Sequence, residues 1–124
     1  MLPFKTQIQP DKPVYEQVVF AVRKAVVTGQ LREGDSFPSV RQLSKELRIN
    51  PNTAHKIIAC LTREGLLQVR PGLGTVVQIP PASTAPDRSA LLKKEMEQLV
   101  VKAKELSLSL NQLVKALEKQ WKNL

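Results

Sequence analysis

The chain has 124 residues, of which 42% are hydrophobic, so it has room for one globular domain and a small appendage. Its formal net charge of +8 and its pI of about 9.9 favour a polyanionic partner such as nucleic acid. Aromatic residues make up only 4% of the chain, which argues against a single-strand binder that stacks bases on rings.

Several other classes of protein are also disfavoured. No apolar run approaches the ~18 residues of a membrane span, and the N-terminus lacks the apolar core of a signal peptide. We therefore expect a cytoplasmic protein with no membrane partner. The single histidine, His55, and the single cysteine, Cys60, supply neither a metal site nor a nucleophile with its base. We expect no enzyme activity and no cofactor, and Cys60 is expected to be a core-facing or half-buried thiol.

The first third of the chain predicts an extended arm and one helix. Residues 1–12 are too short to fold alone. Pro13 suits the first turn of a helix, valines and alanines recur at helical spacing after it, and Gly29 supplies a stop. Residues 30–37 contain Gly34-Asp35 and predict a turn.

Residues 39–64 predict two helices joined by a tight turn. Ser39 and Gln42 have the spacing of a capping box, in which each side chain bonds to the other's backbone. Asn50 is a good N-cap and Pro51 a good first helical residue, so a third helix is expected to run from Pro51 to about residue 64, before Gly65. Its inward residues are expected to be Ala54, Ile57, Ile58 and Leu61, and its outward residues Asn52, His55, Lys56, Ala59 and Arg63.

A hairpin and a linker follow the third helix. Residues 66–69 and 75–79 predict two strands, and residues 70–74 predict the turn between them, with Gly72 and Gly74 free to adopt positive φ. The proline-rich sequence PPASTAP predicts a linker. The expected organisation is a winged helix-turn-helix domain over residues 1–79, a linker over 80–86 and a helical tail over 87–124.

The tail predicts two amphipathic helices that break at residues 107–109, where Ser109 and Gln112 form another capping-box pattern. Such helices have little to bury against in so small a chain, so a second copy is the favoured partner. The alternative is that they fold back on the first domain as a lid. The expected dimer interface consists of Leu92, Met96, Leu99, Ala103, Leu106, Leu110, Val114, Leu117 and Trp121.

The helix-turn-helix spacing predicts a protein that binds double-stranded DNA, because the major groove accepts a single helix. Asn52, Thr53 and His55 are short polar groups near the start of the third helix that can meet base edges or phosphates. Arg41 and Lys56 offer charge for the phosphate backbone. The alternative for Asn52 and Thr53 is that they are ordinary first-turn residues without a role in DNA binding.

The set of motifs from Pro13 to Val77 resembles the winged-helix domain of the GntR family of bacterial transcription regulators. The residues that carry the resemblance are Leu31, Gly34-Asp35, Pro38-Ser-Val-Arg41-Gln-Leu, Asn52-Thr53, Glu64-Gly65-Leu66 and Gly72-Leu-Gly74-Thr75. The resemblance implies a mainly α fold with a small β-hairpin wing. It implies DNA contacts by Arg41, by Asn50, Asn52, Thr53 and His55 at the head of the recognition helix, and by Arg70, Pro71 and Gly72 of a wing in the minor groove.

The chain departs from the family pattern at three positions. His55 stands where the family often has arginine, Leu73 where a basic or polar wing residue is common, and Arg48 where glycine is frequent. These departures concern the operator sequence rather than the mode of binding.

The short tail is similar to that of the YtrA subfamily, which implies dimerisation and repression, often of transporter operons. Too little chain remains for a separate ligand domain, so a small-molecule effector would bind at the dimer interface or between the domains. We therefore expect a homodimeric repressor that binds a palindromic double-stranded DNA operator. The alternative is a winged-helix protein-interaction module that does not bind DNA. The expected DNA-binding residues are Arg41, Asn50, Asn52, Thr53, His55, Lys56, Arg70 and Gly72.

Overall fold

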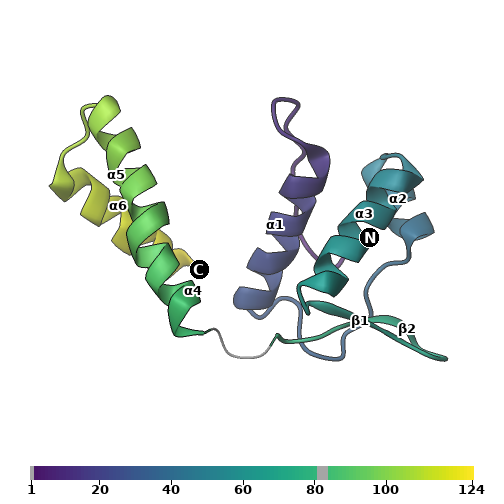
Figure 1. Cartoon of the computed structure of the whole chain (residues 1–124). Coiled ribbons are helices and arrows are strands. Elements are labelled where there is room, and N and C mark those ends of the chain that lie inside the picture. Colours follow the sequence, from purple (N-terminus) through teal and green to yellow (C-terminus); the bar gives the residue numbers. More distant parts are fainter. Residues whose placement is uncertain (1, 81–83) are drawn as a thin grey trace. The chain divides into compact units, whose positions relative to one another are not determined.

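The chain divides into two units, Met1–Pro81 and Ala82–Leu124. The structure is a computed structural model that describes residues 2–80 and 84–124 (Figure 1). No helix in these two ranges is long and apolar enough to cross a membrane.

The first unit contains three helices followed by a β-hairpin (Figure 1). The hairpin is antiparallel, and its register runs from the pair Leu67–Val77 to the pair Arg70–Gly74. This arrangement confirms the predicted fold class, a mainly α protein with a small hairpin wing. The elements are α1 (Val14–Val27), α2 (Val40–Leu47), α3 (Pro51–Arg63), β1 (Leu67–Arg70) and β2 (Gly74–Val77). The strands therefore include Arg70 and Gly74, which the sequence analysis assigned to the turn.

Local side-chain bonds fix where α2 and α3 begin. Ser39 Oγ accepts a hydrogen bond from the backbone N–H of Gln42 at 3.1 Å, which is the Ser39 half of the predicted capping box. Asn50 Oδ1 accepts one from the backbone N–H of Asn52 at 2.8 Å, as predicted for an N-cap. Between the two helices Arg48 adopts a left-handed conformation, with φ 55° and ψ 48°. Because glycine occupies this conformation without a Cβ penalty, arginine is a strained choice in this turn.

The core of the first unit lies where α1 and α2 pack against α3 and β1 covers the end of α3. Burial of large aliphatic side chains removes apolar surface from water, which is the main stabilising term of such a domain. The largest fully buried side chains are Val18, Val22, Leu31, Leu43, Ile57, Leu61, Leu67 and Val77.

The N-terminal arm is anchored to this core, which its sequence did not predict. Phe4 is buried and its ring stacks on that of Phe37, with centroids 5.8 Å apart and an interplanar angle of 5°. The Gln17 side chain bonds to the backbone N–H of Gln9 at 2.7 Å and to the carbonyl of Lys12 at 2.9 Å. The arm thus gains its structure from contacts with the domain, since it has no regular element of its own.

A segment before α2 also forms backbone hydrogen bonds with the hairpin, without forming a strand of its own. Ser36 forms an isolated bridge with Val76, and the N–H of Phe37 donates to the carbonyl of Thr75 at 2.8 Å. The N–H of Gly34 donates to the carbonyl of Val77, also at 2.8 Å. These bonds tie the start of α2 to the wing.

The second unit is a helical hairpin (Figure 1). Its first arm is continuous in sequence and consists of α4 (Ala85–Ala90), the π-helical turn η1 (Leu91–Glu95) and α5 (Met96–Glu105). Its second arm is α6 (Leu110–Asn123). The predicted break at residues 107–109 is confirmed, and Ser109 and Gln112 form the reciprocal bonds of a capping box at 2.9 and 3.1 Å.

The boundary of the expected linker requires a correction. Residues 80–86 were expected to be a linker, but Ala85 and Pro86 belong to α4. The reason is a capping box in which Thr84 and Asp87 satisfy each other's backbone N–H groups, with Pro86 in the first turn where its missing N–H is harmless. The linker prediction for residues 81–83 lies outside the described residues.

Candidate nucleic-acid interface

The outward face of α3 is polar and exposed. Asn52, His55 and Lys56 are all exposed, whereas Ala54, Ile57 and Leu61 on the opposite face are completely buried. A helix with one buried apolar stripe presents its other side chains to solvent, which here leaves no large apolar side chain on the outward face. The predicted assignment of inward and outward residues is therefore confirmed, apart from Ile58, which is half-buried.

The head of α3 is held by the cap residue that precedes it. The carbonyl of Asn50 accepts from the N–H of Thr53 at 2.9 Å, and its carboxamide oxygen is occupied by Asn52 N–H. Thr53 is half-buried, while Asn50 and Asn52 are exposed. The Asn50 side chain therefore serves first as a cap, and its NH₂ group is the part of it that suits an acceptor such as a phosphate oxygen.

Arg41 and the wing belong to the same unit as this face. Arg41 is exposed in the first turn of α2, which packs on α3 and is tied to the wing through Ser36 and Phe37. The hairpin extends away from the three helices to its turn (Figure 1). The elements expected to contact DNA thus belong to one compact unit and are joined by backbone hydrogen bonds and packing.

The wing turn is open and partly apolar. Gly72 and Gly74 have φ of 80° and 82°, as their positions predicted, and the N–H of Leu73 donates to the carbonyl of Arg70 at 3.1 Å. Leu73 itself is 68% exposed. Arg70 Nε bonds to Gln68 Oε1 at 3.3 Å, so the guanidinium stays on the strand that leads into the turn.

One contact at this surface was not anticipated from the sequence. The Nζ atom of Lys56 lies 4.1 Å from the centroid of the Tyr15 ring, which belongs to the first turn of α1. An ammonium over the face of an aromatic ring is attracted by the ring quadrupole. The two residues are far apart in the chain, so only the packing of α1 on α3 brings them together.

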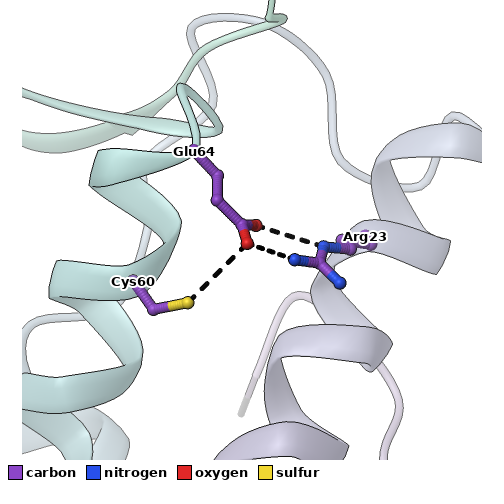
Figure 2. Close-up of polar contacts among 3 residues, drawn as sticks. All are labelled: Arg23, Cys60 and Glu64. Atoms are coloured by element: carbon purple, nitrogen blue, oxygen red, sulfur yellow. Dashed lines mark hydrogen bonds and ion pairs between the residues drawn. The ribbon is translucent and has the colours of Figure 1, made fainter. Parts of the chain in front are cut away.

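A second unpredicted contact joins α1 to the far end of α3. The guanidinium of Arg23 bonds to both carboxylate oxygens of Glu64, the C-cap residue of α3, and its Nε lies 3.2 Å from Oε2 (Figure 2). The Sγ atom of Cys60 lies 3.9 Å from Glu64 Oε1. Cys60 is half-buried, within the range predicted for it. Both charged side chains are substantially exposed, so the pair contributes at most about 1 kcal/mol and mainly orients the two helices.

The described part of the chain contains no group of three His, Cys, Asp or Glu side chains placed to hold a metal ion.

The second unit carries an apolar groove of about 610 Å³. The groove brings together five of the nine side chains expected to form a dimer interface, whereas Leu106, Leu110 and Val114 are exposed outside it. Ala103 is buried within its own hairpin, and Val100 and Leu113, which the sequence analysis did not single out, are half-buried. The groove is lined by Leu91, Leu92, Glu95, Met96 and Leu99 of the first arm and by Leu117, Glu118, Trp121 and Lys122 of α6.

Three helices, a wing and a polar recognition face define a winged helix-turn-helix protein. Residues 14–77 match the family described as bacterial regulatory proteins, gntR family. The chain is 31% identical over 110 residues to the HTH-type transcriptional repressor YtrA of Bacillus subtilis (strain 168), which covers 86% of this chain and 85% of that protein. The chain belongs to the GntR family.

Solved structures share the fold. The structure described as a transcriptional antiterminator from Listeria monocytogenes EGD-e is 24% identical, has a TM-score of 0.80 and covers 94% of this chain and 88% of its own. YtrA from Sulfolobus acidocaldarius, a GntR-family transcription factor, is 23% identical, has a TM-score of 0.54 and covers 97% of each chain. At this level of identity both structures support the fold alone.

Family membership settles the class of function. The chain is a DNA-binding transcription regulator of the GntR family, and the prediction from its sequence is confirmed at that level. Its relatives are regulators, which confirms the prediction that it is not an enzyme.

Proposed function

We propose that this regulator is a homodimeric repressor that binds a palindromic operator, with α3 in the major groove and the wing in the minor groove. The observation that carries the proposal is the exposed polar and cationic face of α3, with Asn52, His55 and Lys56 outward and a fully apolar face inward. A protein-binding surface would instead need exposed aromatic or aliphatic anchors there. This contrast disfavours the alternative of a protein-interaction module.

The residues of this surface are proposed to divide between base reading and phosphate binding. Asn52, Thr53 and His55 would read base edges, since they are polar groups on the first turns of the helix. The phosphate contacts, which position the protein without sequence choice, are assigned to Arg41, Asn50, Lys56 and Arg70, and Gly72 would let the wing backbone approach the minor groove.

The homodimer is proposed because the second unit lacks a core of its own. Within residues 84–124, Ala103 is the only buried side chain, and the groove lined by Leu99, Leu117 and Trp121 is almost entirely apolar. Two helices with so little burial cannot offset the entropy of ordering their backbone. A second copy supplies a matching apolar surface by symmetry. A lid on the first unit is the competing arrangement, and the oligomeric state distinguishes the two.

Repression is proposed on the likeness to a relative that is itself called a repressor. Control of a transporter operon is proposed on the resemblance of the tail to the YtrA subfamily. The site of action would be the cytoplasm, where a bacterial operator lies. The site proposed for a small-molecule effector is the dimer interface.

The binding mode is tested by titrating labelled duplex at several salt concentrations. A regulator that neutralises phosphates should show a log–log salt slope of about −0.9 per phosphate contact. Arg41→Ala and Arg70→Ala should each weaken binding to every duplex and reduce that slope by about one. Lys24→Ala, which removes one exposed cation from α1, is the matched control and should leave the slope unchanged.

Base reading is tested by comparing operator with scrambled duplex. Asn52→Ala should lower operator binding more than scrambled binding, since a base-edge contact is worth about 1–3 kcal/mol of discrimination. Equal weakening on both duplexes would refute its role in base readout. The footprint should be two-fold symmetric, with half-sites about 10 base pairs or a multiple apart. Absence of binding even at low salt would refute the proposed function as a whole.

A further inference from the structure

We propose that Tyr15 is a positioning residue for DNA binding, because its ring holds the Lys56 ammonium at one place on the recognition surface where a phosphate can meet it. The proposal rests on the proposed DNA-binding mode and adds to it a residue of α1, outside the helix-turn-helix and the wing. The observation behind it is the 4.1 Å separation between Lys56 Nζ and the Tyr15 ring centroid.

Lysine needs such a support more than arginine does. Its four-carbon stem is flexible and its charge is a compact point, so fixing the ammonium at one phosphate loses much rotamer entropy. A ring against the ammonium restricts these rotamers before DNA arrives. The Lys56 side chain is then partly ordered in the free protein, so it loses less conformational entropy when DNA binds.

The ring supports the charge without neutralising it. In the described part of the chain, Lys56 forms no ion pair, and its ammonium lies against the aromatic face of Tyr15. A carboxylate would hold the ammonium equally well, but it would repel a phosphate. A neutral ring attracts the cation and leaves its full charge available to an incoming anion.

Both residues are placed for this role. Lys56 is exposed on α3, one turn after Asn52, so it shares the outward face near the head of the helix. Tyr15 is half-buried in the first turn of α1 and packs partly against the core, which fixes the plane of its ring. Because α1 packs against α3, the contact adds a polar link near the start of α3 to the apolar packing and to the Arg23–Glu64 pair at its far end.

The test is a double-mutant cycle on full-length protein with Tyr15→Leu and Lys56→Met, read as affinity for operator and for scrambled duplex across a salt series. Tyr15→Leu should weaken binding to both duplexes about two- to fivefold, the range that an exposed cation–π contact implies. Lys56→Met should also weaken both and reduce the salt slope by about one. In the Lys56→Met background, Tyr15→Leu should have no further effect, because its partner is gone.

Two further variants separate positioning from folding. Tyr15→Phe keeps the ring and should restore the affinity that Tyr15→Leu loses. Phe20→Leu removes an exposed ring from the same helix, away from Lys56, and should leave both affinity and slope unchanged. Thermal unfolding of each variant monitors the fold.

The contact can also be measured without DNA. Ring currents of Tyr15 should shift the Lys56 side-chain proton resonances upfield in the wild type and in Tyr15→Phe, and the shift should vanish in Tyr15→Leu. The proposal is overturned if Tyr15→Leu binds like the wild type, if its effect adds fully to that of Lys56→Met, or if no ring-current shift is found. Failure of the wild type to bind any duplex would instead refute the DNA-binding mode, and the resonance shift would still report whether the contact exists.

Discussion

The two units of this chain are built from similar helices but differ in what those helices bury. In the described residues, every buried apolar side chain except Ala103 belongs to the first unit. There α1, α2 and α3 enclose side chains such as Val22, Leu43 and Leu61 with no exposure at all. In the second unit Leu117 remains 53% exposed. The first unit has a complete core, whereas the second has only one face of a core.

The difference shows that two units with amphipathic helices of similar length can be stabilised in different ways. A helix gains most of its stability from the apolar face it buries, because intrinsic propensity alone is marginal at 10–15 residues. Capping boxes at Thr84 and Ser109 define where the two arms of the second unit begin, but they contribute only about 1 kcal/mol each. The second unit therefore has well-defined local structure but little burial to stabilise it, which is the ground on which the homodimer is proposed.

The largest effect is expected from placing a charge in the groove of the second unit, which tests whether that unit depends on a second copy. Leu99→Asp or Leu117→Asp should convert a dimer into a monomer, because a carboxylate cannot be buried in an apolar interface without a partner. Loss of the second half-site contact should lower operator affinity by about 10²- to 10⁴-fold. Analytical ultracentrifugation measures the first effect and operator titration the second.

The matched control for this substitution is Asn111→Asp, which adds the same charge to α6 away from the groove. It should sediment and bind like the wild type. An unchanged sedimentation profile for Leu117→Asp would refute the proposed dimer interface and favour a tail that folds back on the first unit.

A smaller effect is expected from creating a cavity in the first unit. Leu61 is completely buried, so Leu61→Ala should lower the free energy of unfolding by about 2–5 kcal/mol. The loss should be the same in the full chain and in a fragment of residues 1–80, because that core is complete without the tail. Urea denaturation measures the free energy of unfolding of both proteins.

The control Val27→Ala, at a site 77% exposed, should change the free energy of unfolding by no more than about 0.5 kcal/mol. Failure of the fragment to unfold cooperatively would contradict the independence of the first unit.

The smallest effect concerns a single backbone position of the first unit. Arg48→Gly should raise the free energy of unfolding by about 0.5–1 kcal/mol, because the residue has φ 55° and glycine relieves that strain. The melting temperature should rise by a few degrees, independently of protein concentration. Arg48→Ala removes the same charge and keeps the strain, so it should not stabilise the protein. A gain of equal size in both variants would assign the effect to charge instead.

The helices, their caps and the hairpin could be predicted from the sequence because each depends on local information. Pro51 after Asn50, Gly72 with Gly74, and Ser109 with Gln112 act over a few residues, and all appear in the structure as expected. The outward residues of α3 follow from the helical period, so the face of the candidate site was also predictable.

The sequence missed what depends on distant contacts. Phe4 stacks on Phe37, Lys56 lies over the Tyr15 ring and Arg23 pairs with Glu64, and each pair is separated by at least 33 positions. The periodicity of the sequence does not predict these side-chain contacts, because they depend on how α1 and the N-terminal arm pack against the rest of the domain. The end of the linker was misjudged for a different reason, since the proline at position 86 suits the first turn of a helix as well as a linker.

The sequence by itself determined the order of the elements, the face of α3 that meets solvent and the family of the protein, because these follow from spacing, caps and motifs. Only the tertiary structure decided which side chains have partners. It brought Tyr15 under Lys56, gave the arm its place in the core and left the second unit with an open apolar groove. The physical reason is that burial and long-range contacts depend on the packing of whole helices, which local patterns do not encode.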